Sequence, residues 1–427
     1  MGKEKTEKYK VVVILFYSVI MLVAFGSIIF RGIFRGVLKK EAEGGTSISY
    51  EKMYPFETEE ISYQHEESVE TAESKYRKIA NKVKKTLEWY CTDGFVFQPE
   101  CVEITAFCNK ISGQRVIKSE SIRFSLENRY IVSSADKIDT EEYAKNVIEF
   151  SSFCTQEGIP CYYVESLYKV DRNEKSPLVY DDYTNRNTDS LISQIKDEVE
   201  VLDLRERSAV FEDYNKLFFR TDTHWIPQTG LWAAKEIAEF VDSENEYGLE
   251  TDKLDIVNYV DIPYPKCFLG SLGRNVGLSY SGLEDFDLII PKFETDFRYY
   301  SEQSSIDRSG DFVEAYIDLS ILENIDYYNN SCYAAYMNGR QPLAFLENNI
   351  SSNELSVLFI SDSFGATVAP FLSELFKTTI FIDPRLFDGS IECFIKSEKP
   401  DIVVMMYNPE VITSVNPNSN DSMYMLK

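Results

Sequence analysis

Two short segments of this chain carry side chains that could act together in nucleophilic chemistry. Asp222 and His224 stand two residues apart in "RTDTHW", and His224 is one of only two histidines in 427 residues. Ser363 follows much later in "ISDSFG", between an apolar run and a second apolar segment. An imidazole can take the proton of a serine hydroxyl, and a carboxylate can hold that imidazole in the required tautomer. Ser363, His224 and Asp222 are therefore the candidate nucleophile, base and orienting carboxylate.

Each motif also has an ordinary structural interpretation. Asp222 could be a turn residue, and Ser363 could be a helix N-cap, a position that serine often occupies. Trp225 is typical of core packing. The other histidine, His65, lies among glutamates in "SYQHEESVE" and is expected to be a solvated surface residue. Short motifs often match by chance, so the catalytic interpretation depends on both segments reaching one place in the fold.

Alternating helices and strands are predicted around these motifs. The predicted strands are 159–166, 199–206, 217–220, 355–364, 378–383 and 401–408. The predicted helices are 140–157, 187–198, 230–241, 368–376 and 390–398. Short apolar runs that alternate with helices are typical of an α/β fold with a doubly wound parallel sheet and right-handed crossovers. In such a sheet function gathers at the carboxyl ends of the strands, which is where both motifs would lie.

The region of about 243–337 differs in composition from its flanks. It is richer in Tyr, Ser, Asp and Gly, and it contains strand-like pieces such as "FDLIIPKF". We expect an inserted β-rich segment between the two α/β blocks. It could flank the cleft and help to bind sugar, or it could only pack on the core.

The start of the chain predicts a membrane anchor. Residues 11–30 form a run of 20 residues without a charge, which at about 1.5 Å per residue matches the roughly 30 Å of a bilayer core. No small-residue cleavage signal follows, so the helix is expected to remain. Four basic residues on each side do not decide the orientation, and the default is an anchor with its C-terminal domain outside the cell.

This anchor sets the expected organisation of the whole chain. We expect a cytoplasmic tail, a transmembrane anchor, a stalk, an N-terminal extension, a catalytic domain and a polar tail, at 1–10, 11–30, 31–65, 66–130, 131–415 and 416–427. The predicted location is the cell membrane, with a single-pass helix and an extracellular catalytic domain.

Composition narrows the classes of partner. The formal net charge is −26, which argues against nucleic acid or anionic lipid as the main partner, because phosphate binding relies on Lys and Arg. The eight cysteines are compatible with some disulfides outside the cell. Neither a CxxC pair nor a Cys/His ligand spacing is present, so we expect no metal site and no cofactor.

Around the two motifs the sequence resembles the DHHW family, membrane-anchored bacterial proteins related to the SGNH-hydrolase-like alginate O-acetyltransferases. In that family a D-x-H-W segment is followed much later by a D-S-[YF] strand end, here "RTDTHW" and "ISDSFG". The stretches "YYVESLYK", "DDYTNRNTDSLI", "YAAYMNGRQPL" and "FIDPRLFDGSI" agree with it, over about residues 130–415. The resemblance implies an SGNH-like domain in which Ser363 is the nucleophile, His224 the base and Asp222 its orienter.

The sequence departs from the family pattern at two positions. Thr223 replaces the second histidine and is expected to point away from the pair, and Ser361 replaces the glycine of G-D-S. The asparagine that supplies an oxyanion donor in SGNH enzymes has no certain counterpart. Asn338 and Asn408 are candidates, although either could be a turn residue, and Trp225 is a third candidate for contact with substrate.

The resemblance implies a membrane-anchored serine O-acyltransferase, most simply an O-acetyltransferase, that modifies a cell-surface or exopolysaccharide through an acyl-serine intermediate. A multi-spanning membrane O-acyltransferase is the candidate partner that supplies the acyl group. One alternative is an O-acetyl esterase of the same fold. Another is a non-catalytic surface protein that binds or assembles polysaccharide, an interpretation favoured by the missing asparagine and the replaced glycine.

Overall fold

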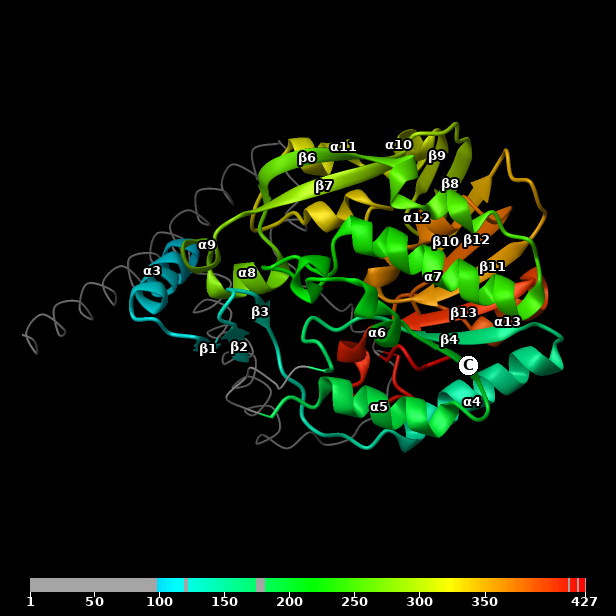
Figure 1. The fold of residues 1–427 in the computed structure, drawn as a ribbon, viewed down its shortest axis with the longest axis horizontal. Coiled ribbons are helices and arrows are strands. Elements are labelled where there is room, and N and C mark those ends of the chain that lie inside the picture. The colour runs from blue at the N-terminus through cyan, green and yellow to red at the C-terminus, as the bar shows by residue number, and fades with distance from the viewer. Residues whose placement is uncertain (1–97, 119–121, 174–180, 414, 421, 427) are drawn as a thin grey trace, which may run out of the picture. The chain divides into compact units, whose positions relative to one another are not determined.

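The computed structural model describes residues 98–118, 122–173, 181–413, 415–420 and 422–426 (Figure 1). The chain divides into two compact units, 1–104 and 105–427, and the second carries both motifs. The predicted cytoplasmic tail, anchor and stalk, with His65, lie outside the described residues. No helix in the described part of the chain is both long enough and apolar enough to cross a bilayer.

Eight strands of the second unit form one large sheet, in the order β5-β4-β13-β11-β12-β10-β8-β9. These strands are β4 (Cys161–Glu165), β5 (Glu200–Asp203), β8 (Phe297–Ser301), β9 (Ile306–Gly310), β10 (Leu343–Asn348), β11 (Ser356–Ser361), β12 (Thr378–Ile382) and β13 (Ile402–Tyr407). The first five in this order are parallel, and β10, β8 and β9 follow with antiparallel pairings. Because β11 is an interior strand, its carboxyl end lies between the carboxyl ends of β13 and β12.

Smaller elements surround this sheet. The remaining strands are β1 (Val116–Lys118), β2 (Ile122–Ser125) and β3 (Ile131–Val132), which form a three-stranded sheet, and β6 (Tyr259–Phe268) and β7 (Glu284–Pro291), which form an antiparallel ribbon. The α-helices are α3 (Gln98–Ile111), α4 (Glu141–Gln156), α5 (Thr184–Ile195), α6 (Leu204–Arg207), α7 (Pro227–Asn245), α8 (Ser271–Val276), α9 (Leu278–Ser281), α10 (Phe312–Tyr316), α11 (Leu319–Glu323), α12 (Ala369–Leu372) and α13 (Ile391–Glu398). The 3₁₀ turns are η2 (Ser208–Val210), η3 (Tyr214–Leu217), η4 (Thr251–Leu254), η5 (Ile256–Asn258), η6 (Cys332–Ala335), η7 (Ser363–Thr367) and η8 (Pro409–Val411).

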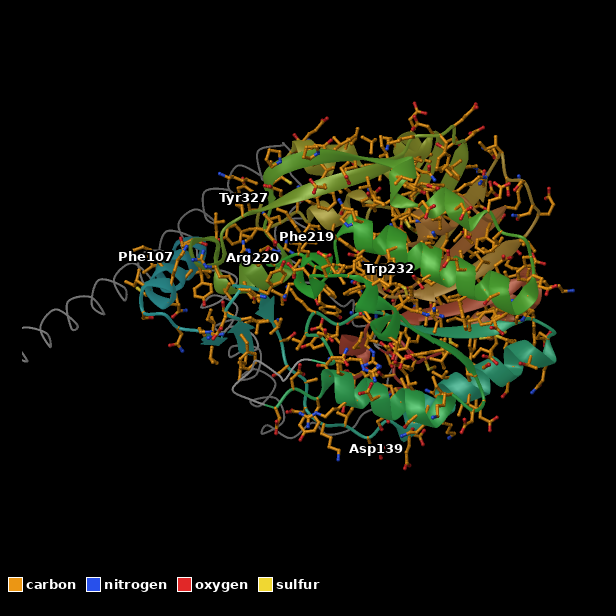
Figure 2. The ribbon with its side chains drawn as sticks, in the orientation of Figure 1. Phe107, Asp139, Phe219, Arg220, Trp232 and Tyr327 are labelled. Carbon is orange, nitrogen blue, oxygen red and sulfur yellow. The ribbon has the colours of Figure 1, made fainter. Side chains whose placement is uncertain are left out.

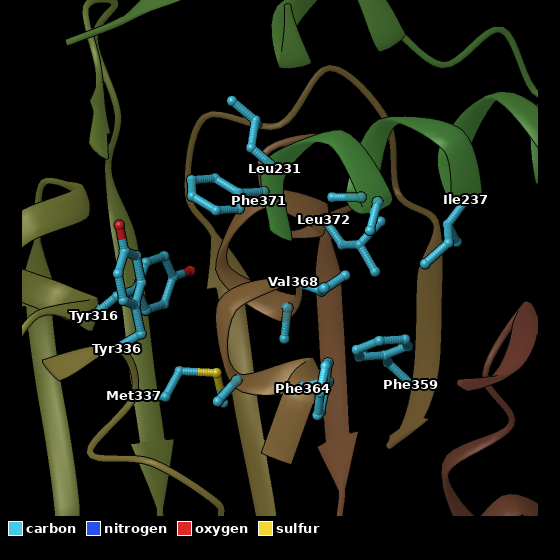
Figure 3. Close-up of a cluster of buried hydrophobic side chains, with 14 of the residues drawn as sticks. Leu231, Ile237, Tyr316, Tyr336, Met337, Phe359, Phe364, Val368, Phe371 and Leu372 are labelled. Carbon is cyan, nitrogen blue, oxygen red and sulfur yellow. The ribbon is translucent and has the colours of Figure 1, made fainter. Parts of the chain in front are cut away.

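Helices cover both faces of the large sheet, and the period of two in its strands assigns side chains to the two faces. Val357 and Phe359 of β11 pack in the same buried cluster as the apolar side of α7, part of which is shown in Figure 3. Leu358 and Ile360 pack on the other face, in a cluster that includes side chains of α4, α5 and α13 (Figure 1). The central strands are therefore buried on both sides, which fits their nearly continuous apolar sequence.

The predicted insertion is partly integrated into the main fold. Within 243–337, β6 and β7 form their own ribbon, whereas β8 and β9 extend the large sheet beyond β10. The predicted parallel sheet is therefore confirmed for β5, β4, β13, β11 and β12, and β10, β8 and β9 extend it with antiparallel pairings that were not predicted. Antiparallel strands can follow one another through short connections, and this pairing depends on long-range contacts that the strand-like pattern alone does not specify.

Most predicted elements of the two α/β blocks are confirmed, and three local expectations are wrong. Residues 217–220 are not a strand of the large sheet. Leu217 is the last residue of η3, and Phe218 forms an isolated bridge with Trp225. The predicted helix 368–376 shortens to the four residues of α12. The segment from 416, expected as a polar tail, places Met423 and Tyr424 in the buried cluster beneath α4 and α5.

Candidate active site

Ser363 lies immediately beyond the carboxyl end of β11. The strand ends at Ser361, Asp362 caps the next turn, and Ser363 is the first residue of η7. The buried Asp362 carboxylate accepts hydrogen bonds from the N–H of Phe364 at 2.8 Å and the N–H of Asn408 at 2.9 Å, which joins the ends of β11 and β13. As the first residue of a helical turn, Ser363 has an N–H that is not used inside that turn.

Gly365 allows this turn to fold back sharply. A Cβ at Gly365 would lie 2.5 Å from the Oγ of Ser361 and 2.9 Å from the ring of Phe381. Ser361 itself donates its hydroxyl to the carbonyl of Met406 on β13, at 2.9 Å. The serine that replaces the family glycine is therefore satisfied by the neighbouring strand.

Asp222 and His224 lie on a loop. Hydrogen bonds to side chains hold this loop in place, in the absence of β-sheet pairing with the large sheet among the described residues. The N–H of Phe219 donates to the carbonyl of His224 at 3.2 Å, which closes the loop on itself. The carboxylate of Glu284, from β7, accepts the N–H of Arg220 at 2.5 Å and the N–H of Thr221 at 2.6 Å. Phe219 and Arg220 mark this loop in Figure 2.

Lys169 holds the same loop from the other side. This lysine is almost fully buried, and its amine donates to the carbonyls of Ile131 at 2.8 Å, Arg220 at 3.1 Å and Asp222 at 2.5 Å. Burial lowers the pKa of Lys169 to about 8, against the opposing effect of nearby carboxylates led by Glu284. One side chain thus ties together β3, the loop and the backbone of Asp222.

The three candidate residues form a continuous hydrogen-bonded chain. The Nε2 of His224 lies 2.7 Å from the Oγ of Ser363, and the Nδ1 of His224 hydrogen-bonds to the Oδ1 of Asp222. The Oδ2 of Asp222 accepts the N–H of Ser271 at 2.6 Å. The side chain of Asp222 is 2% exposed and that of His224 is 15% exposed. The arrangement can move a proton from the serine hydroxyl to an imidazole whose tautomer the carboxylate fixes.

The charge state of Asp222 is set by competing effects. Burial alone would raise the pKa of this carboxyl group. The charge of His224 and the hydrogen bonds from His224 and the Ser271 amide outweigh burial and hold the pKa of Asp222 well below its ordinary value. Asp222 is therefore ionised at neutral pH, as the stabilisation of an imidazolium requires.

An aromatic wall supports the imidazole. The ring of Tyr333 stacks on that of His224 with centroids 4.0 Å apart and an interplanar angle of 17°. The hydroxyl of Tyr333 donates to the carbonyl of Phe364 at 3.2 Å and hydrogen-bonds to Thr367 at 2.9 Å. Trp225 is fully buried and donates its indole N–H to the same Thr367 at 2.9 Å. Trp225 therefore packs against η7 and has no exposed surface for contact with a substrate.

The two candidate asparagines bind elsewhere. The amide of Asn408 donates to the carbonyl of Leu167 at 3.0 Å, and its oxygen accepts the N–H of Glu410 at 2.8 Å. The amide of Asn338 donates to Asp318 at 3.0 Å from a left-handed turn position with φ of 58°. Within the described residues neither side chain hydrogen-bonds to Ser363. Asn408 lies at a strand end and Asn338 in a turn, and their role as oxyanion donors stays a prediction.

The side chain of Thr223 points away from Asp222 and His224, and it makes a hydrogen bond of its own. Its hydroxyl hydrogen-bonds to the carboxylate of Glu410, which also accepts the hydroxyl of Ser133 at 2.7 Å. The position between Asp222 and His224 therefore links the loop to the segment that follows β13.

Sequence reasoning missed several residues that hold the site together. Lys169 and Tyr333 both lie in stretches that carry the family resemblance, "YYVESLYK" and "YAAYMNGRQPL", so the resemblance was a signal for them. Gly270 and Ser271 gave no local signal. A Cβ at Gly270 would lie 2.4 Å from the Cβ of Asp222, so only glycine allows this close approach.

Several solved structures share this fold. PatB1 from Bacillus cereus, solved with a sulfonyl adduct, aligns with a TM-score of 0.58 and 16% identity, covering 73% of this chain and 99% of its own. A DHHW family protein from Eubacterium siraeum aligns with a TM-score of 0.54 and 16% identity, covering 73% of this chain and 96% of its own. The fold is shared with a DHHW family protein. The resemblance drawn from the sequence is thus confirmed as a likeness of fold.

A more distant likeness is to the O-acetyltransferase domain of Pseudomonas putida AlgJ, with a TM-score of 0.40 and 12% identity over 71% of this chain and 99% of that domain. At the level of sequence, no protein-family profile and no curated protein matches this chain.

Proposed function

We propose that this protein is a membrane-anchored serine O-acyltransferase, most simply an O-acetyltransferase, that modifies a cell-surface or exopolysaccharide. The observation that carries the proposal is the hydrogen-bonded chain from Ser363 through His224 to Asp222 at the carboxyl edge of the sheet. The resemblance to the DHHW family supports acyl transfer to a polysaccharide. The uncharged run 11–30 supports a membrane anchor, with a multi-spanning membrane O-acyltransferase as the partner that supplies acyl groups.

The first half of the proposed reaction forms an acyl-enzyme. The Nε2 of His224 takes the proton of the Ser363 hydroxyl while the Oγ attacks the carbonyl carbon of the acyl donor. The carboxylate of Asp222 stabilises the imidazolium that results. We infer that the N–H of Ser363, at the start of η7, donates to the developing oxyanion, because this N–H is not used inside the turn. His224 then returns the proton to the leaving group, and the acyl group remains on Ser363.

The second half of the proposed reaction uses the same base in reverse. A sugar hydroxyl gives its proton to His224 while its oxygen attacks the acyl carbonyl. The bond between the acyl carbon and the Oγ of Ser363 then breaks, His224 returns the proton to this Oγ, and the acylated sugar leaves. If water attacks instead, the product is a free acid and the protein is an esterase. Exclusion of water from the site therefore separates the two outcomes.

Trapping of the acyl-enzyme tests the proposal. The detergent-solubilised full chain is incubated with p-nitrophenyl acetate, and mass spectrometry locates the adduct. We expect an acetyl group on Ser363 in the wild type and none in Ser363→Ala. If the wild type carries no adduct at any pH, while the chain still retains polysaccharide in a binding assay, a non-catalytic binding protein becomes the correct description.

Addition of an acceptor separates transferase from esterase. With oligosaccharides present, a transferase produces acetylated sugar in place of acetate, and the rate of acetate release falls. An esterase releases acetate at a rate that the acceptor leaves unchanged. Both outcomes require Ser363, so Ser363→Ala is the control for each.

A further inference from the structure

Two buried cysteines face one another beside the candidate site. The Sγ atoms of Cys267 and Cys332 lie 3.7 Å apart although the residues are 65 positions apart in sequence. Cys267 is 3% exposed and Cys332 is 5% exposed, and both are free thiols. The thiol of Cys332 donates toward Cys267, and this hydrogen bond lowers the pKa of Cys267 and raises that of Cys332.

Each cysteine belongs to a segment that supports the candidate residues. Cys267 is the penultimate residue of β6, and the chain runs from it through Gly270, against Asp222, to Ser271, whose N–H binds the Asp222 carboxylate. Cys332 begins η6, and the next residue is Tyr333, which stacks on His224. The thiol contact therefore joins the segment that binds the Asp222 carboxylate to the segment that stacks on the His224 imidazole.

We propose that Cys267 and Cys332 form a disulfide in an oxidising environment, and that this bond clamps together the two segments that hold Asp222 and His224. The inference about the bond does not rest on the proposed function. The two sulfurs are already in van der Waals contact at 3.7 Å, and bond formation requires them to approach to roughly 2 Å. Closing a loop of 65 residues restricts the unfolded chain and so stabilises the fold.

The chemistry is thiol–disulfide exchange with a small disulfide oxidant. The Cys267 thiolate attacks one sulfur of the oxidant and releases the first thiol, and a mixed disulfide remains on Cys267. The Cys332 sulfur, having lost its proton, attacks the Cys267 sulfur and releases the second thiol. The oxidant is reduced to two thiols, which take up the two protons that the cysteines lose, so atoms and electrons balance.

Peptide mapping tests whether the bond forms. The full chain is purified without reductant, equilibrated with reduced and oxidised glutathione, unfolded in iodoacetamide and digested with trypsin. We expect the tryptic peptides 267–274 and 309–340 to be joined, and to separate after treatment with dithiothreitol. Alkylation of both Cys267 and Cys332 in the glutathione-treated protein would overturn the proposal, as would pairing of either with another cysteine.

A second measurement tests the clamp, with the exposed Cys393 as the matched control. We expect dithiothreitol to lower the melting temperature of the wild type and of Cys393→Ser by several degrees, and to slow labelling of Ser363 by a sulfonyl fluoride a few-fold. The Cys267→Ser/Cys332→Ser variant should respond to dithiothreitol in neither assay. If the crosslink forms but dithiothreitol leaves wild-type labelling unchanged, the clamp is refuted, whereas complete absence of labelling in all variants would instead contradict the proposed function.

Discussion

At the level of single residues, the proposed acylation of Ser363 depends on the orientation of the His224 imidazole. Asp222 accepts from the side chain and from the backbone N–H of His224, the latter at 3.1 Å. Asp222→Asn would keep the size of this side chain but would present an amide to the Nδ1 and favour the wrong tautomer. We expect the rate of Ser363 acylation by p-nitrophenyl acetate to fall on the order of 10⁴-fold, the effect of the same change in a Ser-His-Asp protease.

The stability of Asp222→Asn supplies its control. The amide would also face the backbone N–H of His224, so the denaturant midpoint should fall. The rates are therefore compared under conditions in which circular dichroism shows both proteins to be folded. A rate within tenfold of the wild type, measured from the initial burst of p-nitrophenol, would show that Asp222 does not orient the base.

Tyr333 offers a pair of variants that separates stacking from hydrogen bonding. Tyr333→Phe keeps the ring against His224 and loses the contacts of the hydroxyl with Phe364 and Thr367. We expect it to lose about 1–2 kcal/mol of unfolding free energy and to retain most of the acylation rate. Tyr333→Leu should instead slow acylation, because the imidazole of His224 loses the aromatic ring that stacks on it. Equal rates in the two variants would contradict a positioning role for the ring.

At the level of elements, the sequence predicts helices and strands that a local apolar period specifies. It does not predict segments whose conformation depends on residues distant in sequence. The strands β4, β11, β12 and β13 and the helices α4, α7 and α13 were all predicted, because apolar runs and amphipathic spacing specify them directly. The segment 217–220 looks like a strand end by the same pattern. It is instead held by Glu284 and Lys169, which stand 64 and 51 positions from Arg220.

The candidate residues show the same division. The roles of Ser363, His224 and Asp222 could be predicted because these residues stand in two short motifs of recognisable chemistry. Asn338 and Asn408 are oxyanion candidates because the sequence shows that each has an amide side chain. The sequence does not show that these amides hydrogen-bond to Asp318 and to the carbonyl of Leu167. The role of the region 243–337 was open between sugar binding and packing. It supplies Ser271, Glu284 and Tyr333 to the site, so its removal would disturb the site itself.

Gly270 provides the test at this scale. A methyl group at this position would collide with Asp222 and with the carbonyl of Thr221, 2.5 Å away. Because the obstacle includes backbone, the loop rather than a flexible side chain must move. Gly270→Ala should slow Ser363 acylation by at least tenfold, as small misplacements of catalytic groups do. Gly248→Ala is the comparison, since a Cβ there meets nothing within 4 Å although its φ of 72° adds local strain. Acylation at the wild-type rate in Gly270→Ala would contradict the tight contact.

At the scale of the whole molecule, one buried carboxyl group should make stability depend on pH. Burial raises the pKa of Glu374 to about 8, against the lowering effects of a hydrogen bond from Tyr259 and of the charge of Lys253. The ordinary value is 4.5, so between these two pH values the folded chain keeps a proton that the unfolded chain has lost. This contribution to stability therefore falls as pH rises through the window, by up to about 1.4 kcal/mol per pH unit.

Glu374→Gln isolates this effect, because glutamine resembles the protonated side chain and does not titrate. Urea unfolding at pH 5.5 and 7.5 should show a larger loss of unfolding free energy with pH in the wild type than in the variant. The same pH dependence in both proteins would show that Glu374 is not the buried group responsible.

The rate of Ser363 acetylation by p-nitrophenyl acetate in two histidine variants tests whether His224 is the base that activates Ser363. His224→Ala should abolish the adduct on Ser363. It should also lower the melting temperature, because the imidazole stacks on Tyr333 and pairs with the buried Asp222 carboxylate, so the rates are compared at a temperature at which circular dichroism shows both proteins to be folded. His65→Ala should acylate at the wild-type rate, since His65 is expected to be solvated. Wild-type acylation in His224→Ala, with its loss in His65→Ala, would show that a different group activates Ser363.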